Sequence, residues 1–221
     1  MVFSDGVAIR ALPIGSDGQA LSAPALIATG AIDRGLAIAW LGDHYVILVA
    51  QGGTIEAYTL TSDGTAIGTT SLAVPAQRVR ITPAPNGGAF IAWEQLMQDP
   101  EGYSGAVLGG VLVDQQLQLA SPIMRYGSYD RFSIPDLLAA IPLGSGFAFG
   151  WRNSTADASL TLVDGTAALT STTVIVPAKT AATLPSVQMS GGLPDSAEFA
   201  ASEYSPDLDA YRLQMIRVSL Q

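Results

Sequence analysis

The chain has 221 residues, of which 48% are hydrophobic and 13% are charged, so it can bury a sizeable core and is not intrinsically disordered. Its 19 acidic residues outweigh 10 basic ones, and the net charge of −9 argues against nucleic acid and anionic membrane surfaces as partners. Cysteine is absent, which excludes disulfides and thiolate metal sites. We expect no cofactor and no bound metal.

The amino-terminal part of the chain offers no membrane span. The longest apolar stretch, residues 23–40, is interrupted by Asp33 and Arg34 and is too short between charges to cross a bilayer. The first ten residues, MVFSDGVAIR, lack the basic start and apolar run of a signal peptide. We therefore predict no membrane insertion and no signal peptide in this chain.

Polar turns recur between apolar β-runs from one end of the chain to the other. In chain order they are Ser16-Asp17-Gly18, Ser62-Asp63-Gly64, Asp114-Gln115-Gln116 and Asp164-Gly165. Counted from Asp17 through Asp63 and Gln115 to Asp164, the intervals are 46, 52 and 49 residues. Asp-Gly between apolar runs predicts a hairpin, because glycine adopts the positive φ of a tight turn without steric cost. A period near fifty predicts propeller blades.

Other predicted strands fall in phase with these turns. The first strands of the units are expected at 36–40, 78–85, 136–143 and 185–190, and the second at 44–50, 87–94, 145–151 and 197–204. The outer strands are expected near 20–27, 66–74, 117–124 and 169–176. The second strands are the most apolar, which is typical of strands that are buried on both faces.

The segment AIAWLGDHYVILVAQGGTIEAYTLTSDGTAIG, with weaker copies that begin at NGGAFIAWEQ and GSGFAFGWRN, resembles the degenerate β-propeller repeats of bacterial secreted and surface proteins. The resemblance implies an all-β protein, a β-propeller of roughly four to five four-stranded blades that is closed, incomplete or part of a larger propeller. It also implies an extracellular or cell-surface location, but it transfers no functional residue. We expect a single domain, 1–221, with repeat units 7–27 together with 185–221, 30–76, 77–127 and 130–178.

No catalytic motif for hydrolases, metalloenzymes or nucleotide-binding enzymes occurs in the sequence. His44, the only histidine, is interpreted as a turn residue with local hydrogen bonds. The three tryptophans, Trp40, Trp93 and Trp151, are interpreted as fillers between blades, with a sugar-stacking platform as the alternative. Glu94 and Arg152, which follow two of them, are expected to reach solvent.

Candidate binding residues lie in the two longest predicted loops, 94–105 and 202–211. They are Asp99, Glu101, Tyr103, Glu203, Tyr204, Asp207, Asp209 and Tyr211. Tyrosines beside carboxylates on a rigid scaffold suit a glycan or a protein partner. Two other interpretations are solvated loop charge and Ca²⁺ binding at 207–209, although that stretch lacks the glycine and later glutamate of an EF-hand loop.

These observations predict a non-enzymatic binding or scaffolding module whose ligand is a protein or a glycan. The alternative is a glycan-active enzyme, or a fragment of one, that uses carboxylates near the central channel, because glycoside hydrolysis needs two carboxyl groups. The four predicted first strands contain a single carboxylate, Asp136. This favours the binding module over the enzyme.

Overall fold

The computed structural model describes residues 1–29, 35–51, 53–98, 104–129, 136–152, 158–176, 186–191, 196–205 and 210–219. These residues form β-strands and turns, with no helix among them, so none of the described chain forms a helix able to span a bilayer. The strands are β1 Val2–Ser4, β2 Ala8–Ala11, β3 Ala25–Thr29, β4 Leu36–Trp40, β5 Tyr45–Gln51, β6 Thr54–Leu60, β7 Ala66–Leu72, β8 Arg78–Pro83, β9 Ala89–Gln98, β10 Ser104–Val113, β11 Met124–Tyr129, β12 Asp136–Leu143, β13 Gly146–Arg152, β14 Ala158–Val163, β15 Leu169–Val176, β16 Ser186–Gly191, β17 Ser196–Ser205 and β18 Ala210–Ser219.

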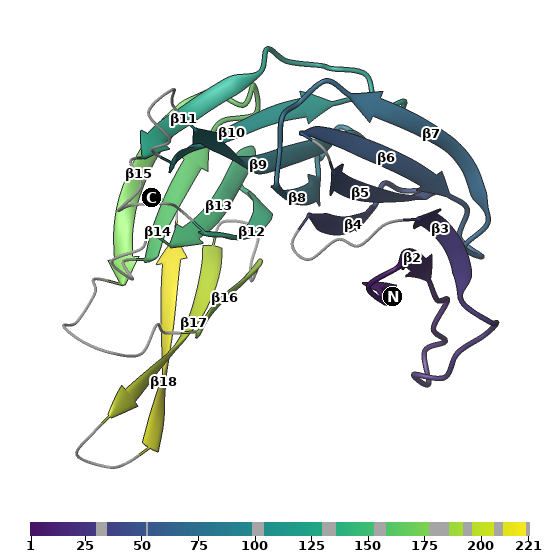
Figure 1. Ribbon diagram of the computed structural model, residues 1–221. Coiled ribbons are helices and arrows are strands. Elements are labelled where there is room, and N and C mark those ends of the chain that lie inside the picture. Colours follow the sequence, from purple (N-terminus) through teal and green to yellow (C-terminus); the bar gives the residue numbers. More distant parts are fainter. Residues whose placement is uncertain are drawn as a thin grey trace.

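The described strands form five antiparallel sheets in which chain neighbours pair. Three sheets have four strands each, β4 to β7, β8 to β11 and β12 to β15, and two have three, β1 to β3 and β16 to β18. The first strands lie side by side in the series β4, β8, β12 and β16, and the sheets fan out from them in an arc (Figure 1). The fold is all-β and propeller-like.

The two ends of the chain occupy separate sheets. We expected 7–27 and 185–221 to complete one unit, but β1 to β3 and β16 to β18 form two sheets at opposite ends of the arc (Figure 1). Within each end the strands pair with their chain neighbours: β2 pairs with β1 and β3, and β17 pairs with β16 and β18. The strand Val2–Ser4 was not predicted, because three residues carry too little periodicity to be recognised.

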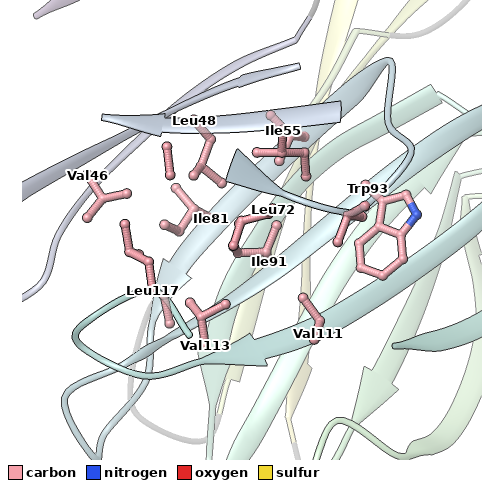
Figure 2. Packing of buried hydrophobic residues seen from close by; sticks show 14 of the residues in the cluster. Val46, Leu48, Ile55, Leu72, Ile81, Ile91, Trp93, Val111, Val113 and Leu117 are labelled. Carbon is pink, nitrogen blue, oxygen red and sulfur yellow. The ribbon is translucent and has the colours of Figure 1, made fainter. Parts of the chain in front are cut away.

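Successive side chains of the second strands β5 and β9 pack into different cores, because they point to opposite faces of the sheet. In β5, Val46 and Leu48 belong to the same core cluster as Ile91 of β9 and Val111 of β10 in the next sheet (Figure 2). The residue between them, Ile47, packs the other way, against the first sheet. The prediction that second strands are buried on both faces is therefore confirmed for β5, β9 and β13, whereas most side chains of 197–204 lie outside the described ones.

Aromatic rings fill the interface between the third and fourth sheets. Phe90 of β9 stacks on Phe147 of β13 with ring centroids 4.8 Å apart, and Phe149 lies within 6.2 Å of Phe90. Tyr126 of the outer strand β11 packs against Phe149 at 5.2 Å and donates a hydrogen bond of 2.7 Å from its hydroxyl to the carbonyl of Ala167. The hydroxyl thus joins the outer strand of one sheet to a turn of the next.

The hairpin between the third and fourth strands of each unit has the same geometry, but not always with glycine at its left-handed position. Gly18 (φ 79°) and Gly64 (φ 87°) take this position in the first two sheets, as predicted. In the third and fourth it is taken by Leu117 (φ 60°) and Ala167 (φ 67°), so the expected role of the Asp164-Gly165 glycine is wrong. Both residues are buried, and packing holds the less favourable backbone in place.

Most strand boundaries follow the prediction. The first strands β4 and β12 begin and end as expected, and the outer strands β7 and β15 lie within the predicted ranges. The outer strand expected at 117–124 begins only at Met124, and the one expected at 20–27 begins at Ala25. In both cases the connection after the turn is longer than a two-residue hairpin, so the apolar residues that suggested an earlier strand belong to the connection.

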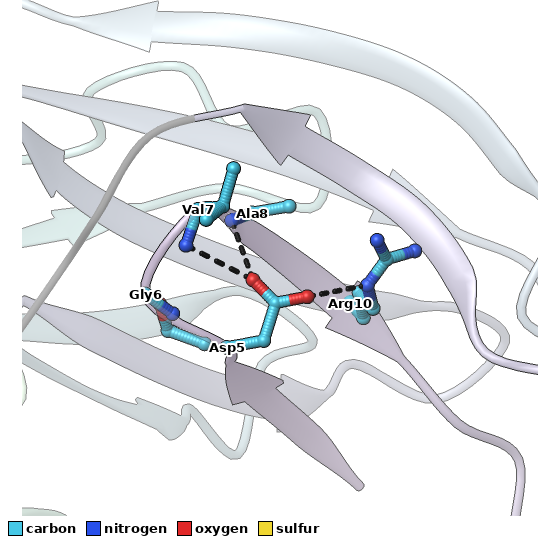
Figure 3. A network of polar contacts seen from close by, with 6 residues as sticks. Asp5, Gly6, Val7, Ala8 and Arg10 are labelled. Atoms are coloured by element: carbon cyan, nitrogen blue, oxygen red, sulfur yellow. Dashed lines mark hydrogen bonds and ion pairs between the residues drawn. The ribbon is translucent and has the colours of Figure 1, made fainter.

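Asp5 organises the short turn between β1 and β2 (Figure 3). One carboxylate oxygen accepts hydrogen bonds from the backbone N–H groups of Val7 (3.0 Å) and Ala8 (2.8 Å), and the other accepts one from Arg10 Nε (2.8 Å). The hydrogen bond from Arg10, followed by the two backbone N–H groups, lowers the pKa of Asp5 to about 2. The ionised form is therefore the one that the folded turn favours.

We expect this turn to weaken in acid. Because the pKa of Asp5 is lower in the folded chain than the ordinary 3.8, its stabilising effect is complete above pH 3.8 and is lost as the pH falls toward 2. Thermal melts of the wild type and of Asp5→Asn at pH 6, 4, 3 and 2 test this. The wild type should be the more stable above pH 4, and the difference should shrink toward pH 2; a difference independent of pH would contradict the assignment.

Candidate functional site

A solvent-open cavity of about 500 Å³ lies where three turns of the third and fourth sheets meet. Asn86 and Gly88 of the β8–β9 turn line one side, and Gly165 and Thr166 of the β14–β15 turn line another. The rest comes from the end of β10 and the connection to β11, with Leu112, Val113, Asp114, Gln115, Gln116, Ala120, Ser121 and Pro122. The cavity therefore spans two neighbouring sheets.

The Asp114 carboxylate holds the tip of the β10–β11 connection. Its Oδ1 accepts hydrogen bonds from the backbone N–H groups of Gln116 (2.9 Å) and Gln118 (2.8 Å). Leu117, at the same tip, is buried in the core between the second and third sheets, and this burial also fixes the position of the tip. Gln115 and Gln116 are exposed, and their backbone is held by the Asp114 hydrogen bonds and by the burial of Leu117.

The Asp164 carboxylate holds the β14–β15 turn in the same way. Its Oδ1 accepts hydrogen bonds from the N–H of Thr166 (2.8 Å), the hydroxyl of Thr166 (2.7 Å) and the N–H of Ala168 (3.0 Å). These bonds, the Thr166 hydroxyl first, lower the pKa of Asp164. Burial, with a smaller effect from the Asp164 charge, raises the pKa of Tyr126, so its hydroxyl stays protonated and donates to Ala167. The third sheet therefore contacts the fourth through the β14–β15 turn, which the Asp164 hydrogen bonds hold in place.

The side chains around the cavity are mostly neutral hydrogen-bonding groups. Asn86, Gln115 and Gln116 contribute amides, which both donate and accept, and Thr166 contributes a hydroxyl. Asp114 is the one carboxylate among the lining residues, and its Oδ1 already accepts two backbone hydrogen bonds. Leu112, Ala120 and Pro122 add apolar surface beside these groups. Such a surface suits a neutral ligand that has both hydroxyl groups and apolar patches.

The predicted binding loops are shorter than expected. β9 continues to Gln98 and β10 begins at Ser104, while β17 continues to Ser205 and β18 begins at Ala210. Within the predicted loops, residues 94–98, 104–105, 202–205 and 210–211 are thus paired strand residues. The alternation of apolar and polar residues was too weak there to reveal the strands, since charged and aromatic side chains interrupt it.

The eight predicted site residues are only partly placed. Asp99, Glu101, Tyr103, Asp207 and Asp209 lie outside the described residues. Glu203 and Tyr204 lie in β17 and Tyr211 lies in β18, where Tyr204 and Tyr211 are direct partners in the ladder and Glu203 is the partner of Arg212. Their role in binding stays a prediction.

Glu94 corrects one expectation about charge. Its side chain is 2% exposed instead of reaching solvent, and Arg78 Nη1 lies 3.0 Å from Glu94 Oε2. Arg78 is the direct partner of Glu94 in the β8–β9 ladder, so the register brings the guanidinium to the buried carboxylate. Arg152, also expected at the surface, is half-buried. The pattern of polar and apolar residues along β9 could not predict the contact between Glu94 and Arg78, because Arg78 comes from another strand, β8.

Two of the three tryptophans are buried and one is exposed. Trp93 and Trp151 are buried between sheets, as predicted, and Trp151 Nε1 donates a hydrogen bond of 3.0 Å to Thr161 Oγ1. Trp40 is 39% exposed at the end of β4, where its ring meets that of Tyr45 edge-on at 4.6 Å. For Trp40 the expected burial between blades is wrong.

His44 Nδ1 contacts the Asp43 carboxylate in the β4–β5 turn, which confirms the predicted local hydrogen bonding of His44.

The cavity was not predicted as a site. Of its lining residues, the sequence predicts turns only at 114–116 and at Gly165, and both turns are confirmed. Gly88 and residues 120–122 were expected in the strands 87–94 and 117–124. The proximity of the two turns could not be predicted, because it depends on how the third and fourth sheets pack. Among the described residues, no three His, Asp or Glu side chains gather as a metal site would require.

No protein-family model matches the sequence, and no curated protein matches it. Among solved structures the chain is similar to a protein of unknown function from Bacteroides caccae, with a TM-score of 0.52 and 12% identity over 98% of this chain and 70% of that chain. At this identity the likeness shows the fold alone.

Two other solved structures align more loosely. A prolyl endopeptidase structure has a TM-score of 0.30 and 9% identity, over 98% of this chain and 47% of that chain. The WD40 domain of SCAP from fission yeast has a TM-score of 0.26 and 9% identity, over 99% and 73%. TM-scores this low support no statement about this chain.

Proposed function

We propose that this protein is a non-enzymatic binding module and that its ligand is a glycan, held in the cavity between the third and fourth sheets. The observation that carries the proposal is the lining of that cavity, in which neutral amides and a hydroxyl stand on rigid turns beside apolar surface. Amides that donate and accept match the hydroxyl groups of a sugar, and binding surfaces are commonly placed on connections of a rigid scaffold.

The glycan-active enzyme remains the second candidate. Glycoside hydrolysis by the usual routes needs two carboxyl groups on either side of the scissile bond. The cavity lining contributes Asp114, whose Oδ1 is engaged by the turn that it stabilises. This favours binding over hydrolysis.

We also propose that the protein belongs to the bacterial secreted or surface propeller repeats and that it is extracellular. The support for both is the spacing of the repeated strands and turns in the sequence.

A glycan array followed by titration calorimetry tests the proposal. The wild type should bind at least one glycan class, and Gln116→Ala should weaken that binding by about tenfold, the effect of losing an interaction of about 1.4 kcal/mol. Gln118→Ala is the matched control, because Gln118 is exposed in the same connection but does not line the cavity. It should leave affinity unchanged.

Other outcomes separate the candidates. If a variant with Tyr103, Tyr204 and Tyr211 all changed to Ala loses binding while Gln116→Ala retains it, the ligand contacts the predicted loops and not the cavity. Hydrolytic turnover of the bound glycan would overturn the non-enzymatic assignment. Absence of binding to any glycan would overturn the ligand class.

A further inference from the structure

The outer strand β11 contains a β-bulge at Tyr126. In the ladder between β10 and β11, Arg125 and Gly127 each have a partner on β10, and Tyr126 between them is the extra residue. A bulge redirects the side chain of its extra residue. The first sheet has a corresponding bulge in β3 at Ile27, whose apolar side chain packs into the core. Tyr126 differs from Ile27 by carrying a hydroxyl group at this position.

A glycine of the neighbouring strand makes room for the Tyr126 ring. A Cβ at Gly110 of β10 would lie 2.7 Å from Cε2 of Tyr126 and 2.6 Å from Cζ of Phe90, too close for either ring to stay in place. The Tyr126 ring also packs against Phe149 of the fourth sheet, with 5.2 Å between the ring centroids. The bulge and this packing therefore direct the hydroxyl toward the fourth sheet.

The Tyr126 hydroxyl reaches the turn that forms the fourth-sheet side of the cavity. It donates a hydrogen bond of 2.7 Å to the carbonyl of Ala167. Ala167 directly follows Gly165 and Thr166, which line the cavity, and its backbone is in the left-handed region (φ 67°). Residues 120–122, which line the cavity from the third sheet, come shortly before Tyr126 in the chain. This hydrogen bond thus connects the two sides of the cavity.

We propose that Tyr126 is a positioning residue of the cavity, whose hydroxyl holds Thr166 at a fixed position relative to Gln116 of the third sheet. The inference rests on the proposed function, in which these groups contact one glycan. Tyr126 does not itself line the cavity, so it acts through the turn and not on the ligand. Side chains on two sheets bind one ligand well only when the sheets keep their spacing, because a turn that must first be ordered lowers affinity.

Tyr126→Phe removes the hydroxyl and keeps the ring. Hydrogen exchange measured by NMR should show the N–H groups of Thr166 and Ala168 exchanging roughly three- to tenfold faster than in the wild type, because loss of one hydrogen bond eases local opening of the turn. The N–H groups of Gln116 and Gln118, which are held within the third sheet, should exchange at the wild-type rate. They are the internal control.

Thr161→Val is the matched control variant. It removes the buried hydroxyl that accepts the hydrogen bond from Trp151 Nε1 in the fourth sheet, at a position outside the cavity lining. It should lower the melting temperature without changing exchange at Thr166 or binding to the glycan array. Tyr126→Phe should weaken binding to the same array by roughly threefold or more, measured with serial dilutions of the protein.

Circular dichroism establishes that both variants remain folded. Exchange at Thr166 and Ala168 that Tyr126→Phe leaves unchanged would overturn the proposal, and so would array binding equal to that of the wild type. Faster exchange in Thr161→Val as well would also overturn it, because the effect would then reflect general destabilisation. A wild type that binds no glycan overturns the proposed function instead, and the exchange rates then decide by themselves whether Tyr126 positions the turn.

Discussion

Replacing Phe147 by alanine is expected to lower the free energy of unfolding by about 3–5 kcal/mol, the usual range for removing a buried phenylalanine. Phe147 is fully buried between the third and fourth sheets and stacks on Phe90. Both rings belong to second strands, where neighbouring backbone is paired on both sides and cannot collapse into the space left behind. The loss should therefore include a cavity term in addition to the lost burial.

Urea denaturation of Phe147→Ala measures this effect, and Leu169→Ala is its matched control. Leu169 begins β15 of the same sheet but is largely exposed, so its replacement should change stability by about 0.5 kcal/mol or less. A double-mutant cycle with Phe90→Ala should show coupling of about 0.5–1.5 kcal/mol between the stacked rings. Equal effects at Phe147 and Leu169 would contradict the assignment of Phe147 to the core between sheets.

Replacing Gly88 by alanine is expected to destabilise the protein by about 1–3 kcal/mol or more, as overpacking does. A Cβ at Gly88 would lie 2.0 Å from the carbonyl oxygen of Val113, and one at Gly146, the corresponding position of the fourth sheet, would lie 2.1 Å from that of Val163. The obstacle is backbone and not a flexible side chain. The second and third strands would have to separate to admit the methyl group.

The same substitution at Gly68 is the control for Gly88→Ala. Gly68 lies in β7, its φ is not positive and no atom lies within 4 Å of the position of an added Cβ. We expect Gly68→Ala to change stability by less than about 0.5 kcal/mol. Because Gly88 also lines the cavity, Gly88→Ala should weaken the proposed glycan binding as well, whereas Gly68→Ala should not. Equal denaturation midpoints for the two variants would contradict the close backbone approach at Gly88.

The candidate site was much less predictable than the fold. Asp114 and Asp164 mark their turns in the sequence, because an aspartate that accepts backbone N–H bonds is a local feature of a turn. The cavity between those turns depends on the packing of the third sheet against the fourth, through Phe90 and Tyr126. Sequence reasoning instead favoured the acidic and tyrosine-rich segments, since polar aromatic residues are the commonest local sign of a binding surface.

The all-β class, the repeat near fifty residues and the burial of second strands such as 145–151 could be predicted from local pattern, because alternation and turn chemistry are local properties of the chain. Tertiary structure alone decided that Leu117 and Ala167 occupy left-handed positions, since only a packed core can hold that backbone without glycine. It also decided that Glu94 is buried against Arg78, because pairing between β8 and β9 supplies the opposite charge. Both outcomes depend on partners from other strands, and a local pattern does not specify such partners.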